Sequence, residues 1–441
     1  MIAIVTSLTP DEVSSWQRLK NILGGSGGNL VEWFDWFSYA AFSVYFASVF
    51  FPEGDQTTQF LKSAVVFGVG FIARPLGAWL MGRYCDRAGR KAGLVLSIIM
   101  MCFGSLMIAV TPGHAEIGIF APVLLTAARI IQGLSLGGEY GASATYISEM
   151  AGKSHRGLWS GVLYITLIGG QLLALGLLSL LQLLLSPAAL HAWGWRIPFV
   201  VGALLALTVL WMRRDMDETA SYRAVRKLEV ERGSTMTLIS SFPRETAFIF
   251  LVSAAGSCAF YVYTTYMQKF LINSAAGPMG EGFSKDQASQ IMLFVLVTFM
   301  IMQPISGWLS DVIGRRLLLV GAFGLGAAAA YPIHRLLLTA STPMEAVALC
   351  TIPLIILSGY TAVSAIFKAE LFPAHVRSLG VGLPYAVASA FFSGNAESGA
   401  LWFKHSGNES GFYLVLTALL ATAFVASVLM KDPKRHSRIL D

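Results

Sequence analysis

The amino-acid sequence predicts an all-α membrane protein in which twelve transmembrane helices form two similar six-helix bundles. Of the 441 residues, 55% are hydrophobic and only 13% are charged, and the mean hydropathy is +0.64. A single soluble core would not cover so much apolar surface, which excludes an ordinary soluble protein. Apolar runs of about 20 residues, the length that crosses a bilayer, recur along the chain. A polar motif also occurs twice, about half the chain apart, and indicates a duplicated module.

The apolar runs place the expected helices. In chain order they lie near residues 22–51, 62–82, 92–111, 117–141, 158–185, 195–212, 245–272, 287–309, 316–338, 344–367, 378–402 and 410–430. Residues 1–20 lack an apolar core followed by a small-residue cleavage site, so we expect no cleaved signal peptide. The first helix is therefore expected to act as the insertion signal.

The expected domains follow from these helices. They are an N-terminal segment (1–20), an N-terminal bundle (21–212), a linker (213–244), a C-terminal bundle (245–430) and a tail (431–441). The linker is the longest charged interval and is expected to carry a short surface helix. Most of the 31 Lys and Arg residues, Lys368 and Arg377 among them, fall in alternate loops. By the positive-inside rule, these loops, the linker and both termini are cytoplasmic.

Two landmarks repeat between the halves. The first is Gly82-x-x-x-Asp86-Arg87-x-Gly89-Arg90, which recurs as Gly307-x-x-x-Asp311-x-x-Gly314-Arg315, with the two Asp residues 225 positions apart. The second is a Glu–Arg pair seven residues apart, Glu149 with Arg156 and Glu370 with Arg377, at an offset of 221. Two landmarks with nearly the same offset support a duplication, and duplicated membrane modules are typical of transporters.

The motif loops, the string Arg129-x-x-Gln132-Gly133 and the twelve-helix pattern together resemble the major facilitator superfamily. Within it, segments 28–35 (GNLVEWFD), 74–75 (RP), 132–141 (QGLSLGGEYG) and 193–199 (WGWRIPF) are similar to the metabolite:proton symporter family. Segments 166–175, 264–269 and 368–382 look most like its transporters of 2-oxoglutarate. The resemblance implies the major facilitator fold, with two bundles that rock around a central site.

The resemblance also assigns the repeated motifs to a gate. It implies that Asp86 contacts the cytoplasmic end of a helix from the other half, where a helix N-terminus favours an anion. Asp311 would do the same in the second half. The other implied gate residues are Gly82, Arg87, Gly89, Arg90, Glu149, Arg156, Arg315, Glu370 and Arg377. The simpler interpretation is that the basic residues only hold short loops inside.

Two arginines lie deep in the predicted membrane. Arg74 precedes Arg83 by nine residues, which puts it roughly 13 Å from the cytoplasmic end of its helix. A buried Arg is costly unless it faces a cavity or a partner, so we expect Arg74 to face the central cavity and contact substrate. A fixed ion pair with Asp35 or Glu32 is the alternative. Arg129 is similarly deep, and together with Arg74 it would hold both carboxylates of a dianion.

Other polar residues complete the predicted substrate site. Lys269, near the outer end of the seventh helix, is a third cationic candidate, although a lysine in that position also snorkels to the interface. Tyr266, Gln171 and Asn395 would add hydrogen-bonding groups.

Three acids are candidates for proton coupling. Glu32 and Asp35 lie three residues apart on one face of the first helix, and Glu139 lies in the fourth. Burial favours a neutral acid and a nearby Arg favours an ionised one, so competition between them makes a proton switch. We expect Asp35, with Glu32 or Glu139 as second choice, to take the proton and free an Arg for substrate. A fixed ion pair that only positions helices is the alternative.

The two halves differ in their buried charges. Alignment on the repeat places Arg129 against Cys350 and Glu139 against Tyr360. We therefore expect proton coupling in the first half, and shape and hydrogen bonds from the second.

The sequence thus predicts proton-coupled symport of a small dicarboxylate, 2-oxoglutarate above all, across a bacterial inner membrane. The alternative cargoes are citrate, shikimate, another organic acid, proline and betaine. A channel is disfavoured because no pore-lining ring of charge repeats, and an enzyme because no supported nucleophile or metal cluster appears. We expect no metal and no cofactor besides the coupling proton. The expected partners are an organic anion and the lipid bilayer, with no nucleic acid, and a single copy is expected to function.

Overall fold

The structure is a computed structural model that describes residues 15–53, 56–214, 216–226, 231–278 and 280–439. Across these residues all regular structure is helical, and no strand occurs. The predicted all-α fold is therefore confirmed. Most of the predicted N-terminal segment, residues 1–14, lies outside the described residues.

The N-terminal half contains six long helices. They are α1 (Ser15–Phe50), α2 (Gln56–Ala88), α3 (Arg90–Val110), α5 (Phe120–Met150), α6 (Arg156–Leu184) and α8 (Ile197–Arg214). The short helices between them are α4 (His114–Ile117), η2 (Lys153–His155), α7 (Pro187–Ala192) and η3 (Gly194–Arg196).

The C-terminal half also has six spans, three of them made of consecutive pieces. The spans are α11 (Pro243–Tyr261) with η4 (Val262–Tyr266) and α12 (Met267–Asn273), α13 (Lys285–Ile313), α14 (Arg315–Leu337), α15 (Pro343–Thr361) with α16 (Ser364–Leu371), α17 (Arg377–Phe392) with α18 (Ala396–His405), and α19 (Glu409–Leu429). Ser284 and Thr342 begin α13 and α15 with capping boxes, which satisfy N–H groups that a helix start leaves unpaired.

Ten of the described spans are long and apolar enough to cross a membrane. α1, which carries Glu32 and Asp35, and the interrupted pair α17–α18 complete the predicted twelve. Ile72 and Leu183 are 76% and 85% exposed, whereas both acids of α1 are fully buried. Apolar side chains outside and charges inside suit a protein surrounded by lipid.

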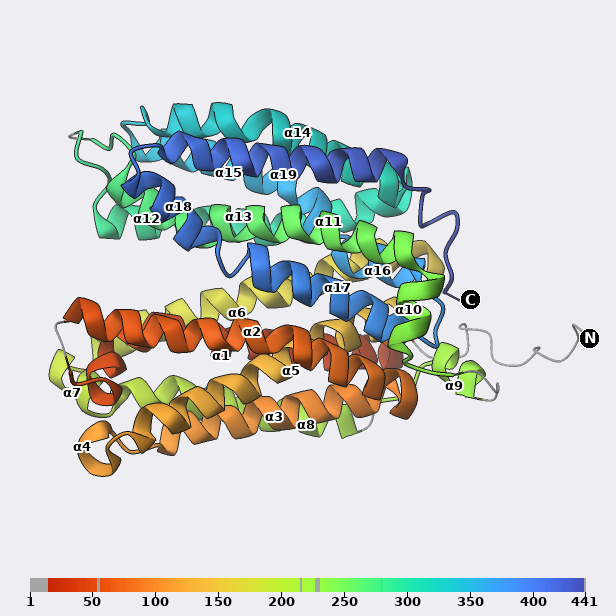
Figure 1. The fold of residues 1–441 in the computed structure, drawn as a ribbon, viewed down its shortest axis with the longest axis horizontal. Helices are drawn as coiled ribbons and strands as arrows, with labels where there is room; N and C mark the ends of the chain where they lie inside the picture. The colour runs from red at the N-terminus through yellow and green to blue at the C-terminus, as the bar shows by residue number, and fades with distance from the viewer. Residues whose placement is uncertain (1–14, 54–55, 215, 227–230, 279, 440–441) are drawn as a thin grey trace, which may run out of the picture.

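The two halves lie side by side, the first in red to yellow-green and the second in green to blue (Figure 1). Between them, α6 packs on α13, and α17 packs on α2 and α5. A Cβ on Gly141 of α5 would lie only 2.9 Å from the carbonyl oxygen of Ser378, so glycine permits this contact. The linker holds two short helices, α9 (Ala220–Arg226) and α10 (Thr235–Ser241), where one was expected. They lie at the same end of the bundle as the C-terminus, which we call the linker end.

Candidate functional site

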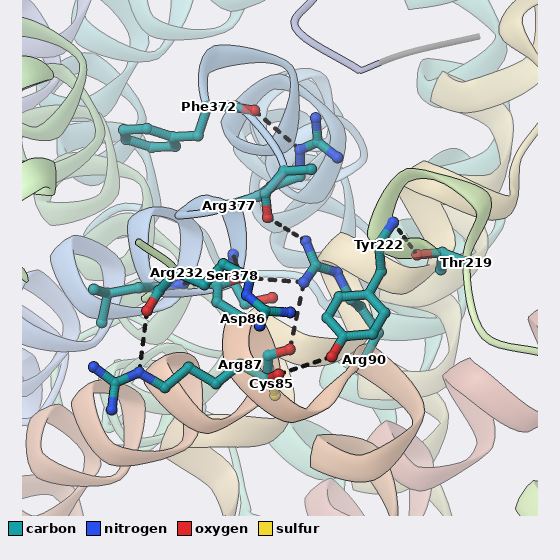
Figure 2. Close-up of polar contacts among 12 residues, drawn as sticks. Cys85, Asp86, Arg87, Arg90, Thr219, Tyr222, Arg232, Phe372, Arg377 and Ser378 are labelled. Carbon is teal, nitrogen blue, oxygen red and sulfur yellow. Dashed lines mark hydrogen bonds and ion pairs between the residues drawn. The ribbon is translucent and has the colours of Figure 1, made fainter. Parts of the chain in front are cut away.

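The repeated motif of the first half binds a helix of the second half (Figure 2). The two carboxylate oxygens of Asp86 accept hydrogen bonds from the backbone N–H groups of Ser378 and Leu379, each at 3.1 Å. These residues form the first turn of α17, where unpaired N–H groups and the helix dipole favour an anion. Arg90 lies 3.4 Å from Asp86 and balances its charge. The predicted contact of Asp86 with the other half is thus present at the linker end.

Glu149, at the end of α5, joins this contact to a buried charge network. It pairs with Arg90 of its own half at 3.2 Å and with Arg377 of the other half. Arg90 also donates to the carbonyl oxygen of Ala374 at 2.5 Å, and Arg377 donates to that of Phe372 at 3.0 Å. One carboxylate therefore holds cations from both halves together.

The second half repeats the arrangement with the roles exchanged. Asp311 in α13 accepts hydrogen bonds from the backbone N–H groups of Gly157 and Leu158, each at 2.9 Å, in the first turn of α6. Arg315 lies 2.7 Å from Asp311 and 3.5 Å from Glu370. Two contacts of the same kind therefore close the linker end.

Linker residues fasten the first of these contacts (Figure 2). The Tyr222 hydroxyl donates to the carbonyl oxygen of Arg87 at 2.8 Å, and the Arg87 guanidinium donates to the carbonyl oxygen of Arg232 at 3.1 Å. Gly89 has φ 119°, which a residue with a Cβ rarely adopts, and a Cβ there would lie 2.3 Å from Glu218 Oε2. Arg87 is exposed, so it ties the motif to the linker rather than to the other half.

The remaining predicted gate residues lie in the same region. A Cβ on Gly82 would lie 2.9 Å from the Cα of Leu379, so glycine lets α2 approach α17. Arg156 is buried at the start of α6, beside the residues that bind Asp311. The structure thus brings all the predicted gate residues to the linker end.

Replacing Asp86 by Asn is expected to loosen the linker end. The variant lacks the ionised acceptor of two N–H groups, and hydrogen bonds to charged groups are worth about 1.5–3 kcal/mol each. Leu379 is fully buried against Gly82, so a cysteine placed there should react with a thiol reagent about tenfold faster in the variant. The background chain has its four native cysteines replaced by alanine.

Glu53→Gln is the matched control for this measurement, because Glu53 is an exposed acid with a surface partner, Lys62. Its labelling rate should equal that of the background chain. Equal rates in Asp86→Asn and the background would contradict a gating role for Asp86.

Two narrow, adjoining pockets lie between the halves. Both are lined by Trp33 and Tyr385; Arg74 and Tyr140 line the first, and Tyr164, Tyr261 and Tyr360 line the second. Each has room for little more than a water molecule, so a larger ligand would enter only after the helices separate. Arg74 faces the centre of the molecule, where the sequence predicts it.

Arg74 is held by aromatic rings instead of by an acid. Its guanidinium carbon lies 4.0 Å from the ring centre of Phe71 and 4.1 Å from that of Trp36. Its Nε and Nη2 atoms have no hydrogen-bond partner, and no acid among the described residues forms an ion pair with it. The fixed ion pair with an acid of α1, the alternative for this residue, is therefore absent from the described structure. Arg129 also lies 4.1 Å from the Trp36 ring centre, so one indole contacts both arginines.

The acids of α1 contact α5. Asp35 accepts a hydrogen bond from the amide of Gln132, and the oxygen of the same amide accepts one from Arg129 at 2.7 Å. Glu32 accepts a hydrogen bond from Ser135 at 2.7 Å. Asp35 and Arg129 are therefore linked through one side chain, so a change of charge on the acid would reach the arginine.

Glu139 has a buried ionic partner. Arg213 Nη2 lies 2.5 Å from Glu139 Oε1, and Ser97 and Ser143 also donate to this carboxylate. The sequence prediction places Arg213 in the linker, but it belongs to the last turn of α8 and is fully buried. This arrangement resembles the fixed ion pair that was the alternative for the acids, and it favours Asp35 and Glu32 over Glu139 as the proton carrier.

Four predicted substrate residues lie apart from Arg74. Lys269 is half exposed and pairs with an acid of α18, and Tyr266 donates to an acid at the start of α19. Asn395 lies between α17 and α18 and donates to the carbonyl oxygen of Phe391, near the end of α17. Gln171 is buried in α6, and its Oε1 has no hydrogen-bond partner. None of the four lines either central pocket.

The sequence prediction missed a buried lysine and four tyrosines of the pockets, Tyr140, Tyr164, Tyr360 and Tyr385. It places Lys368 in a cytoplasmic loop, which is wrong because Lys368 lies inside α16 and is fully buried. Its Nζ donates to the hydroxyl of Tyr140 at 2.9 Å and lies 4.1 Å from the ring centre of Tyr385. The available signal was the uncharged stretch 346–367, which precedes Lys368 and continues from α15 into α16.

The comparisons with known proteins agree with this architecture. Residues 21–240 match the family described as Sugar (and other) transporter, and residues 265–440 match the Major Facilitator Superfamily. The structure is similar to that of the proton:xylose symporter XylE, with a TM-score of 0.76 over 93% of this chain and 95% of that one. Sequence identity to that structure is 17%, so this likeness concerns the fold.

Curated relatives match over nearly their whole length. The chain is 49% identical to the alpha-ketoglutarate permease of Escherichia coli (strain K12) over 425 residues, which cover 96% of each protein. It is 30% identical to the citrate-proton symporter of Klebsiella pneumoniae over 92% of each. The chain therefore belongs to the major facilitator superfamily and, within it, to the metabolite:proton symporter family.

Proposed function

We propose that this chain is a proton-coupled symporter of 2-oxoglutarate in a bacterial inner membrane, with the linker end and both termini in the cytoplasm. The observation that carries the proposal is Arg74, a buried arginine without an ionic partner among the described residues, on a pocket between the halves. The planar guanidinium of an arginine can donate two parallel hydrogen bonds to one carboxylate. The 49% identity to an alpha-ketoglutarate permease supports this cargo.

The gates and the buried acids supply the cycle. With the linker end closed by Asp86 and Asp311, cargo and proton reach the site from the periplasm. Protonation of Asp35 removes the negative charge that accepts the hydrogen bond from Gln132. Arg129, which Gln132 links to Asp35, then no longer faces that charge. The two halves then rock and the contacts at the linker end separate. The cargo and the proton leave to the cytoplasm.

The remaining parts of the proposal concern the number of copies and the partners. The pockets and both gates lie within one chain, so a single copy in the bilayer suffices. The coupling proton is the only cofactor, the cargo leaves unchanged because the protein is not an enzyme, and neither a metal nor a nucleic acid takes part.

Citrate is the second candidate cargo, because the chain also resembles a citrate-proton symporter. Counterflow in proteoliposomes distinguishes the candidate cargoes. Uptake of labelled 2-oxoglutarate is measured in the presence of an unlabelled competitor, which is succinate, citrate, shikimate, proline or 2-oxoglutarate. We expect unlabelled 2-oxoglutarate to compete most strongly. Failure of 2-oxoglutarate to compete would overturn the proposed cargo, and stronger competition by citrate would replace it.

A further inference from the structure

Lys368 is a fully buried cation whose charge the protein does not balance nearby. Its Nζ donates to the hydroxyls of Tyr140 at 2.9 Å and Ser364 at 2.8 Å. Four aromatic rings of the described residues also lie around it, and the nearest ring centres are those of Tyr385 at 4.1 Å and Tyr140 at 4.8 Å. No acid among the described residues forms an ion pair with Lys368. A buried charge without a counterion is costly, so such a residue needs a reason to be there.

The unbalanced charge adjoins the pocket that Arg74 lines. Tyr140 and Tyr385, whose rings stack at 4.1 Å, form part of that pocket, and Lys368 lies behind both. Arg74 comes from α2 of the first half and Lys368 from α16 of the second. Two buried cations, one from each half, therefore flank one site, and neither has an ionic partner in the described structure.

We propose that Lys368 binds one carboxylate of the cargo while Arg74 binds the other, so that a dicarboxylate bridges the two halves. The inference rests on the proposed function and adds the second cationic contact, which the sequence prediction gives to Arg129. A carboxylate accepts a hydrogen bond from an ammonium more strongly than a neutral phenol does. It would therefore take over the bond that Tyr140 now accepts, and the freed hydroxyl would stay beside the cargo.

Bridging gives the site a preference for dianions. A ligand with one carboxylate balances only one of the two cations and leaves the other buried without a counterion. A dicarboxylate balances both, and it also connects the two halves while the site is closed. Arg74 and Lys368, which come from different halves, would thus together select ligands with two carboxylates over ligands with one.

The test is direct binding by isothermal titration calorimetry to the purified full-length protein. The ligands are 2-oxoglutarate and 2-oxobutanoate, which lacks the second carboxylate. Lys368→Gln and Arg74→Gln should each weaken 2-oxoglutarate binding by roughly 30-fold or more, because removing a buried charged partner costs about 2 kcal/mol or more. Only one of these two substitutions should weaken 2-oxobutanoate. Lys368→Arg, which keeps the charge, should recover part of the affinity for 2-oxoglutarate.

Lys431→Gln, which removes an exposed charge in the tail, is the control and should bind both ligands as the wild type does. Thermal melting of each variant checks that it is folded. Wild-type affinity of Lys368→Gln for 2-oxoglutarate would overturn the bridge, as would an equal loss for both ligands in both variants. Failure of the wild type itself to bind 2-oxoglutarate would instead overturn the proposed function.

Discussion

Arg74→Gln is expected to abolish counterflow of 2-oxoglutarate while the protein remains folded. Glutamine keeps hydrogen-bonding capacity but removes the one charge that the described residues of the first half place on the pocket wall. Losing a charged partner from a buried ion pair costs about 2–5 kcal/mol, which corresponds to roughly 30- to 4,000-fold in affinity. Uptake of labelled 2-oxoglutarate into preloaded proteoliposomes measures the effect.

Arg74→Lys separates charge from shape at the same position. Lysine keeps the charge but lacks the planar group that lies over Trp36 and Phe71, so only part of the transport should return. Arg83→Gln, in the same helix, is the matched control, because Arg83 lies over Trp79 near the helix end and away from the pockets. Counterflow by Arg74→Gln at the wild-type rate would rule out a substrate contact.

Asp35→Asn is expected to uncouple transport from the proton gradient. The amide has nearly the shape of the acid and still contacts Gln132, but it cannot bind and release a proton. Accumulation of 2-oxoglutarate driven by an imposed pH gradient should therefore vanish, while counterflow, which needs no net proton movement, should persist at a reduced rate. The two assays are made on the same vesicles.

The control for this substitution is Glu281→Gln. Glu281 is an exposed acid in the loop between α12 and α13, so its replacement should affect neither assay. Full pH-driven accumulation by Asp35→Asn would contradict the assignment and leave Glu32, the other acid that contacts α5, as the next candidate. Loss of both activities together, with normal folding, would show that Asp35 serves binding rather than coupling.

The gate was predictable because its parts recur in the sequence. Asp86 and Asp311 stand at matching positions of a duplicated motif, and the structure places each on the first turn of a helix from the opposite half. A short polar motif between long apolar runs has few possible locations, so composition and spacing place it in a loop at one end of the helices. Its contact with the opposite half was predicted from the family resemblance. The predicted twelve spans follow from the same contrast between apolar and polar residues.

The central site was less predictable, as Lys368 and Arg213 show. Each lies close to residues that belong to a loop or the linker, and one helical turn decides whether such a cation is buried. Whether it has a counterion depends on another helix: Arg213 meets Glu139, whereas Lys368 meets hydroxyls and rings. Tyrosines in apolar helices give no sequence signal that separates a pocket lining from packing, and Tyr140 and Tyr385 meet only because α5 and α17 cross.

Having two acid-to-helix contacts at one end also limits how often the empty carrier opens at the linker end. Asp86 and Asp311 must both release their helices, so the free energies of the two contacts add. Every additional 1.4 kcal/mol of contact free energy lowers the fraction of time spent in the open form about tenfold, so the second contact makes idle opening rarer than one contact alone would. Every idle opening is an opportunity for a proton to cross without cargo. In the proposed transport cycle, the duplicated contact thus limits proton leakage and preserves the proton gradient that drives transport.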